Sequence, residues 1–138
     1  MKALKFVAFL LLCSSLQYNN PKSFEIIGSA TKNISINVKE KVELSEIRFK
    51  NTTDHDLILS WETTSMTFPK EWDFSMCAYG KCQVGIPKKG ELRKISSGKI
   101  GFIAIHVFPR GEKGNGLVKF KLTDPINKKT SKELTFKV

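Results

Sequence analysis

The chain has 138 residues, of which 41% are hydrophobic, and it carries a formal net charge of +10. This length corresponds to a single domain, and the apolar content is enough for a packed core, which excludes wholesale disorder. The basic residues are spread along the chain without a recognition-helix pattern or a stacking motif, so the charge predicts a solvated basic surface and no nucleic-acid partner.

Residues 1–15 have the pattern of a secretory signal peptide. Lys2 and Lys5 form a short basic segment, and residues 6–12 form an unbroken apolar segment. This apolar segment is too short to span a bilayer as a permanent helix. The N-terminus therefore predicts an exported protein, located in the periplasm, at the outer membrane or outside the cell.

The processing of this segment has two interpretations. Cleavage after Ser15 is favoured because Cys13 and Ser15 put small side chains at both positions that a signal peptidase reads. Alternatively, the sequence Leu-Leu-Leu-Cys at residues 10–13 resembles a bacterial lipobox, in which Cys13 carries lipid. Leu12 is larger than the residue that normally precedes such a cysteine, so we rank lipidation second and expect membrane attachment only if Cys13 is lipidated.

Apolar and polar residues alternate with a period of two after a short linker, and this period predicts β-strands. The first strand is predicted over residues 33–38. In residues 42–49 the apolar positions change phase, so that segment needs a bulge near Ser45 to keep them all on one face. Residues 57–61 predict a further strand that places Trp61 in the core.

The second half of the chain mixes irregular and regular segments. Residues 66–87 contain several Pro and Gly residues and predict an irregular region. Residues 100–108 are apolar in both phases, which predicts a central strand that is covered on both faces over part of its length. Residues 118–122 and 134–138 predict closing strands, and the Gly-rich residues 110–116 predict a hairpin loop between strands.

We predict from these elements an all-β protein, namely an immunoglobulin-like two-sheet antiparallel sandwich of about seven strands. The predicted organisation is a signal peptide at residues 1–15, a linker at residues 16–23 and the sandwich domain at residues 24–138.

Several local motifs resemble those of short Ig-like domains from exported Bacteroidetes proteins. The shared features are an Asn-Thr-Thr turn at residues 51–53, the strand tryptophan Trp61, a Pro-x-x-Trp corner at residues 69–72, the close pair Cys77 and Cys82, and a Gly turn at residues 97–100. The resemblance covers roughly residues 24–138 and implies the sandwich fold and export. It also implies an accessory module, but fold similarity does not transfer an activity.

Cys77 and Cys82 predict a disulfide bond. An exported chain meets an oxidising compartment in which two nearby thiols tend to pair. The four intervening residues include Gly80 and permit a tight hairpin. A redox centre more commonly has Cys-x-x-Cys at the start of a helix, so we interpret this bond as a structural clamp on a surface hairpin.

The sequence offers two candidate binding sites, an aromatic platform and a soft-metal site, whose residues could instead serve only for packing. Trp72, Phe74 and Tyr79 could form an aromatic platform for a sugar ring or a peptide, although Trp72 could equally cap one end of the core. A soft-metal site of the copper type is the other alternative. Its candidate ligands are Met66, Met76, Cys77, Cys82, His55 and His106. Adjacent strand residues point apart, so Met76 and Cys77 should not converge, and we predict no metal or other cofactor.

No catalytic set is evident in the sequence. There is no nucleophile elbow, and neither histidine has the setting of a general base. We therefore predict a non-catalytic accessory or interaction module of the cell envelope, with an unknown protein or glycan partner. Carbohydrate binding through exposed aromatic residues and periplasmic metal binding are the alternatives.

Overall fold

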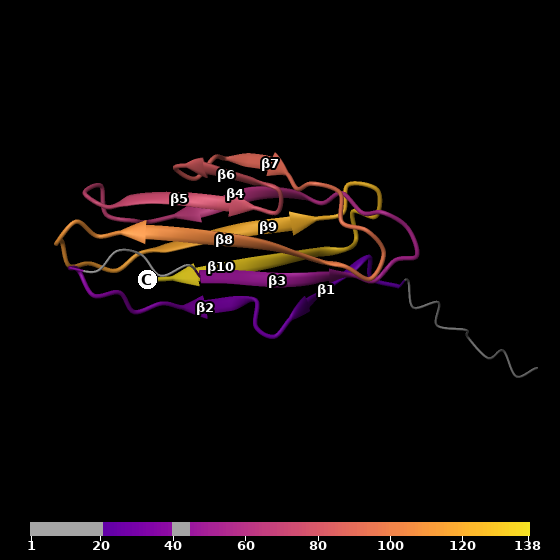
Figure 1. Cartoon of the computed structure of the whole chain (residues 1–138), viewed down its shortest axis with the longest axis horizontal. Coiled ribbons are helices and arrows are strands. Elements are labelled where there is room, and N and C mark those ends of the chain that lie inside the picture. Colours follow the sequence, from indigo (N-terminus) through magenta and orange to yellow (C-terminus); the bar gives the residue numbers. More distant parts are fainter. Residues whose placement is uncertain (1–20, 40–44) are drawn as a thin grey trace, which may run out of the picture.

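The computed structural model describes residues 21–39 and 45–138, which form ten β-strands in two layers (Figure 1). The strands are β1 (Phe24–Ile27), β2 (Thr31–Asn33), β3 (Ser45–Asn51), β4 (Ser60–Met66), β5 (Asp73–Ala78), β6 (Lys81–Val84), β7 (Lys89–Glu91), β8 (Ile100–Phe108), β9 (Leu117–Thr123) and β10 (Ser131–Lys137). Among these described residues, no helix is long and apolar enough to cross a membrane.

The strands form two five-stranded sheets. The first sheet has the order β1-β3-β8-β5-β6, and the second has the order β2-β10-β9-β4-β7. All strand pairs are antiparallel except β2 with β10, which run parallel. The series β1-β3-β8-β5 corresponds to the A-B-E-D sheet of an immunoglobulin domain, and β10-β9-β4 corresponds to its G-F-C sheet. The protein is therefore an all-β, Ig-like sandwich, as the sequence predicts.

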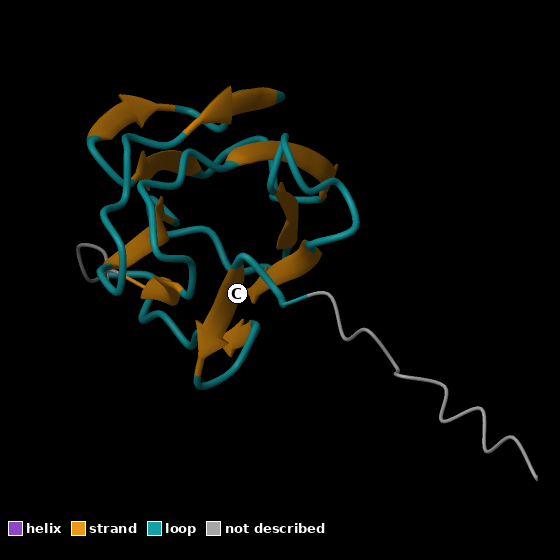
Figure 2. Cartoon of the chain, turned by 90° about the vertical axis from the view of Figure 1, so that its right-hand side faces the viewer, coloured by secondary structure: helices purple, strands orange, loops and turns teal. Residues whose placement is uncertain are grey.

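The core lies between the two sheets, which enclose it when the sandwich is seen end-on (Figure 2). Phe24 and Phe49 of the first sheet meet edge to face with ring centroids 6.2 Å apart. In the second sheet, Phe120 packs edge to face on both Trp61, at 5.9 Å, and Phe136, at 6.1 Å. Such aromatic pairs add to the stabilisation from buried area. Trp61 is 3% exposed, which confirms its predicted place in the core.

The predicted strand at residues 33–38 is wrong. Only Asn33 belongs to a strand, at the end of β2, and the residues after it are irregular. The amide of Ile34 still donates to the carbonyl of Lys137 at 2.7 Å, but the carbonyl of Val38 accepts from the amide of Gly111, in a loop, at 3.1 Å. The alternating apolar residues of this segment cover one end of the sandwich, so the period of two indicated burial without sheet pairing. The bulge predicted near Ser45 is not seen in β3, which pairs with β8 from Ser45 to Lys50 without a register shift, while Val42 and Leu44 lie outside the described residues.

The prediction of about seven strands is also too low. Residues 66–87 contain two strands, β5 and β6, where an irregular region was expected, and β7 follows directly. The turn between β5 and β6 contains Gly80 with a φ of 97°, a left-handed conformation that glycine adopts at little cost. The long strand at residues 100–108 is confirmed as β8, which lies in the middle of the first sheet.

At each open side of the sandwich, two consecutive edge strands belong to different sheets. At one side, β1 belongs to the first sheet and β2 to the second, and at the other side β6 belongs to the first and β7 to the second (Figure 1). Edge strands offer backbone groups for unwanted pairing, and short edge strands limit that risk. The two edges of the second sheet, β2 and β7, have only three residues each.

A buried polar contact ties the two sheets together at one end of the sandwich. Ser23 immediately precedes β1, and its hydroxyl donates to the carboxylate of Asp124, which immediately follows β9. Both residues are only 4% exposed. Burial raises the pKa of Asp124, but hydrogen bonds from Ser23 and from the amides of Asn127 and Ile126 outweigh it, so this pKa is lowered. Ser23, the last residue of the predicted linker, thus packs as part of the domain.

Candidate functional site

The outer face of the first sheet carries a row of partly exposed apolar side chains. Along β8, Ile103, Ile105 and Val107 point into the core, so the alternate residues point outward. We define the apolar stripe as the outward residues Ile100, Phe102 and Phe108 of β8, together with Tyr79 at the β5–β6 turn and Val84 of β6. The exposed fractions are 46% for Ile100, 37% for Phe108 and 96% for Val84. Tyr79 and Phe102 meet edge to face at 5.8 Å.

Charged residues flank the apolar stripe in oppositely charged pairs. On the β3 side, Arg48 binds the carboxylate of Glu46. On the β5 side, the Arg110 Nε donates to Asp73 at 2.6 Å. Both carboxylates of this rim are thus balanced by arginine. Lys50 of β3, opposite Ile100, adds a basic side chain to the rim, and His106 lies between Phe102 and Phe108 within the row.

The predicted disulfide is confirmed, and it lies on this same outer face. Cys77 and Cys82 are directly opposite each other in the β5–β6 hairpin and are joined by a bond of 2.01 Å. Cys82 is exposed and Cys77 is half-buried. Met76, the residue before Cys77, is fully buried on the opposite face, which confirms that these two adjacent side chains diverge.

One of the candidate metal ligands, His106, lies beside the disulfide. The Nε2 atom of His106 is 3.8 Å from the Sγ atom of Cys77. The two residues are neighbours because β5 pairs with β8 in a register that places Ser75 opposite His106 and Cys77 opposite Ala104. The alternation along residues 100–108 could have placed His106 on the outer face. Only the strand pairing, which the sequence does not reveal, brings it to Cys77.

The remaining candidate metal ligands are not gathered with this pair. His55 bonds the carboxylate of Asp54 in a loop at 2.8 Å, and Met66 ends β4 in the other sheet. Within residues 21–39 and 45–138, no group of three or more His, Cys, Asp or Glu side chains is placed to hold a metal ion.

The three predicted aromatic ligand-binding residues do not share one surface. Trp72 is 4% exposed, and its indole Nε1 donates to the carbonyl of Glu112 at 3.0 Å. Trp72 and Phe74 both pack on Phe68, with ring centroids 6.0 and 5.5 Å from it, respectively. Tyr79 belongs to the apolar stripe instead. Trp72 thus caps one end of the core and does not form part of an exposed aromatic platform.

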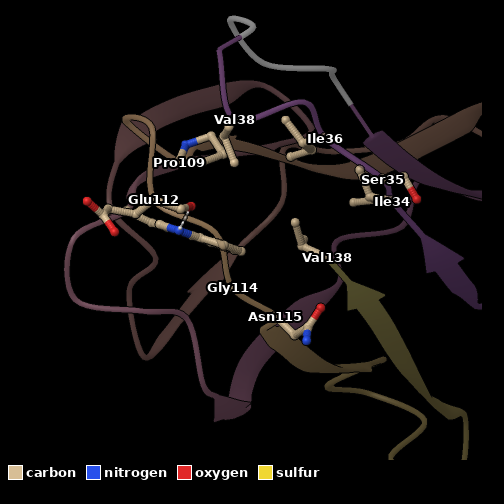
Figure 3. A pocket seen from close by; sticks show the side chains of 10 residues that line it. Ile34, Ser35, Ile36, Val38, Pro109, Glu112, Gly114, Asn115 and Val138 are labelled. Atoms are coloured by element: carbon tan, nitrogen blue, oxygen red, sulfur yellow. Dashed lines mark hydrogen bonds between the residues drawn. The ribbon is translucent and has the colours of Figure 1, made fainter.

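A small pocket opens at this end of the sandwich (Figure 3). Its volume is about 230 Å³, and one wall is the indole of Trp72. The other apolar lining residues are Ile34, Ile36, Val38, Pro109 and Val138. Trp72 is held close to the loop because Gly114 has no side chain, and a Cβ atom there would lie 3.1 Å from the indole. The alternation at residues 34–38 therefore builds an apolar hollow and not a strand.

No family model and no curated protein sequence matches this chain. Solved structures do match its fold. The N-terminal domain of PorA has 14% identity and a TM-score of 0.54, over 83% of this chain and 96% of that one. The ASH/PapD-like domain 7 of human CEP192 has 12% identity and a TM-score of 0.53, over 99% of this chain and 94% of that one.

An enzyme is also among the structural matches. A family 123 glycoside hydrolase from Clostridium perfringens has 14% identity and a TM-score of 0.50. The match covers 84% of this chain but only 27% of the hydrolase, so it concerns one part of a larger protein. At these identities the three similarities establish the class of this protein, an Ig-like β-sandwich, and nothing about its ligand.

Proposed function

We propose that this protein is an exported, non-catalytic interaction domain of the cell envelope that binds another protein through the apolar stripe. The observation that carries the proposal is the exposure of Ile100, Phe108 and Val84 on one sheet face. In an antiparallel sandwich the outer phase of each strand is ordinarily polar because it meets water. Several exposed apolar side chains on one face mark an interaction site more often than a single one does.

The composition of the stripe favours a protein partner. Protein interfaces combine an aromatic and aliphatic centre with a polar rim. Here Phe102, Phe108 and Tyr79 supply the aromatic residues, and the rim contains the pairs of Glu46 with Arg48 and Asp73 with Arg110. An anionic lipid or polysaccharide surface would instead be expected to meet unpaired basic residues.

The oxidised cysteine pair supports export. Disulfides persist in secreted and periplasmic proteins and are rare in the cytosol. The bond between Cys77 and Cys82 therefore agrees with the signal peptide predicted at residues 1–15, which lies outside the described residues. The mass of the intact exported protein tests the signal peptide, because cleavage after Ser15 and lipid on Cys13 give different masses.

Site-specific photo-crosslinking in the source organism tests the proposed surface. A photoreactive phenylalanine analogue replaces Phe108 in the apolar stripe of the full-length chain, and the matched control places it at Lys121, on the outer face of the second sheet. We expect a discrete crosslinked protein from position 108 and none from position 121. Addition of Val84→Lys to the first variant should abolish the product, because Val84 lies near the Phe108 end of the stripe and a charge there would be buried in the contact.

Two outcomes would contradict the proposal. Equal products from positions 108 and 121, or no product at position 108 in the exported protein, would exclude the stripe as the binding surface. Binding to a glycan array that is lost in Tyr79→Ala but retained in Ile100→Lys would favour the carbohydrate-binding alternative instead.

A further inference from the structure

We infer that the bond between Cys77 and Cys82 is a thiol-exchange site, in which Cys82 accepts an incoming thiolate and His106 stabilises the thiolate that leaves at Cys77. This chemistry is separate from partner binding by the apolar stripe and does not depend on it. Three observations carry the inference: the position of the bond in the hairpin, the unequal exposure of the two sulfurs, and the histidine beside one of them.

The position of the bond shows that the fold has little need of it. Cys77 and Cys82 are only five residues apart and lie opposite each other in a hairpin that is already held in register by the pairs on either side, Met76 with Gln83 and Ala78 with Lys81. The stabilisation from a disulfide grows with the length of the loop that it closes, so a loop this short gains least. The bond can therefore open without unfolding the sandwich.

The two sulfurs are not equivalent toward an incoming thiol. Cys82 is exposed on β6, which is the edge strand of the first sheet. Cys77 is half-buried on β5, between β6 and β8. Exchange requires an approach along the S–S axis to the sulfur that is attacked, and only Cys82 combines exposure with an edge position.

His106 faces the sulfur that leaves. Its Nε2 lies 3.8 Å from the Sγ of Cys77, and among the described residues the outward carboxylates of the neighbouring strands are Glu46 of β3 and Asp73 of β5. Glu46 is bound by Arg48 and Asp73 by Arg110, so neither is available as a dedicated partner for the imidazole. A cationic or N–H-donating imidazole beside a sulfur stabilises its thiolate form.

The step is balanced without an external oxidant or reductant. A thiolate RS⁻ forms a bond to the Sγ of Cys82 while the bond between Cys82 and Cys77 breaks, and the electron pair goes to the Sγ of Cys77. The products are the mixed disulfide Cys82–S–S–R and the Cys77 thiolate, which His106 stabilises. The reverse step, attack by Cys77 on Cys82, restores the original bond and releases RS⁻. A thiol with a more stable thiolate leaves faster, so His106 accelerates the forward step.

Reduced glutathione is the probe for this inference, used with the full exported chain. Acid quenching, alkylation and peptide mass mapping give the second-order rate constant for opening and show which cysteine carries glutathione. In the unmodified protein we expect glutathione on Cys82 and the alkyl group on Cys77. His106→Gln should slow opening by about tenfold, whereas the control His55→Gln, which changes the other histidine of the chain, should leave the rate unchanged.

The pH profile separates this role from a merely structural one. The ratio of the rate constants for the unmodified protein and His106→Gln should grow as the pH is lowered, because a charged imidazole stabilises the Cys77 thiolate more than a neutral one does. Glutathione found mainly on Cys77 in the unmodified protein would overturn the inference, and this measurement needs no variant. Equal rates for the unmodified protein and a folded His106→Gln variant would overturn it as well.

Discussion

The outer faces of the two sheets present opposite chemistry to water. Across the second sheet, Glu133 of β10, Lys121 of β9, Glu62 of β4 and Lys89 of β7 lie opposite one another in register, so that negative and positive side chains alternate over four strands. The outer face of the first sheet carries the apolar stripe instead of such a charged row. Cross-strand pairs of opposite charge support the register of a sheet.

This difference shows which part of the sequence serves the fold and which part does not. Both sheets bury the same kind of side chain inside, as Phe49 and Phe120 illustrate. The second sheet shows that a charged outer face is compatible with this sandwich. The exposed apolar residues of the first sheet's outer face are therefore not required by the architecture, and this is why we base the proposed binding surface on them.

The largest effect should come from removing an inner residue of β8. Ile103 is fully buried, and Ile103→Ala should destabilise the protein by about 3 kcal/mol because it leaves a cavity in the core. Ile100 on the same strand is 46% exposed, and Ile100→Ala should cost less than about 1 kcal/mol. Urea denaturation of the two variants measures both values. Equal losses would show that the apolar stripe is a second structural layer and would remove the contrast between the faces.

The tie between the sheets should make stability depend on pH. Folding lowers the pKa of Asp124, so the folded protein binds fewer protons than the unfolded chain in acid, and the contribution of Asp124 is lost as the pH falls below about 4. Asp124→Asn should cost about 2 kcal/mol at neutral pH, because a buried carboxylate that accepts from Ser23 and Ile126 is replaced by an amide.

The acid dependence itself provides the test. The difference in stability between the unmodified protein and Asp124→Asn should shrink as the pH is lowered from about 7 to about 3. Glu71→Gln, which alters an exposed carboxylate, serves as the control and should change neither the stability nor its pH profile. A difference that stays constant over this range would mean that the charge of Asp124 does not hold the sheets together.

Composition and periodicity were sufficient for the fold class and for its central elements. The apolar residues 100–108 predicted β8 with the observed bounds, and the export signal together with the cysteine spacing predicted the disulfide. The cysteine spacing predicted the hairpin around Gly80, but the strand character of β5 was missed because frequent Pro and Gly residues outweighed the alternation of residues 73–78. In residues 33–38 the alternation was real, but it reflected apolar packing at the end of the sandwich.

The candidate site was less accessible to sequence reasoning because it depends on which strands are neighbours. The two apolar phases of residues 100–108 predicted cover on both faces, and Ala104 is indeed fully buried. Ile100 and Phe108 at the ends of the same strand are exposed, and the local sequence pattern does not distinguish these exposed residues from the buried ones. Likewise, His106 and Cys77 are 29 residues apart, and only the pairing of β5 with β8 joins them.

The smallest effect should come from the charged face of the second sheet. Lys121 lies between Glu62 and Glu133 in neighbouring strands, so Lys121→Glu places three carboxylates in one row. We expect a loss of stability of less than about 1 kcal/mol, since cross-strand charge pairs at exposed positions are weak. High salt should remove most of this loss by screening, whereas it should not rescue Ile103→Ala. Partner binding through the apolar stripe should be unchanged in Lys121→Glu. A larger loss in binding than in stability would assign the interaction to the charged face and reverse the roles of the two sheets.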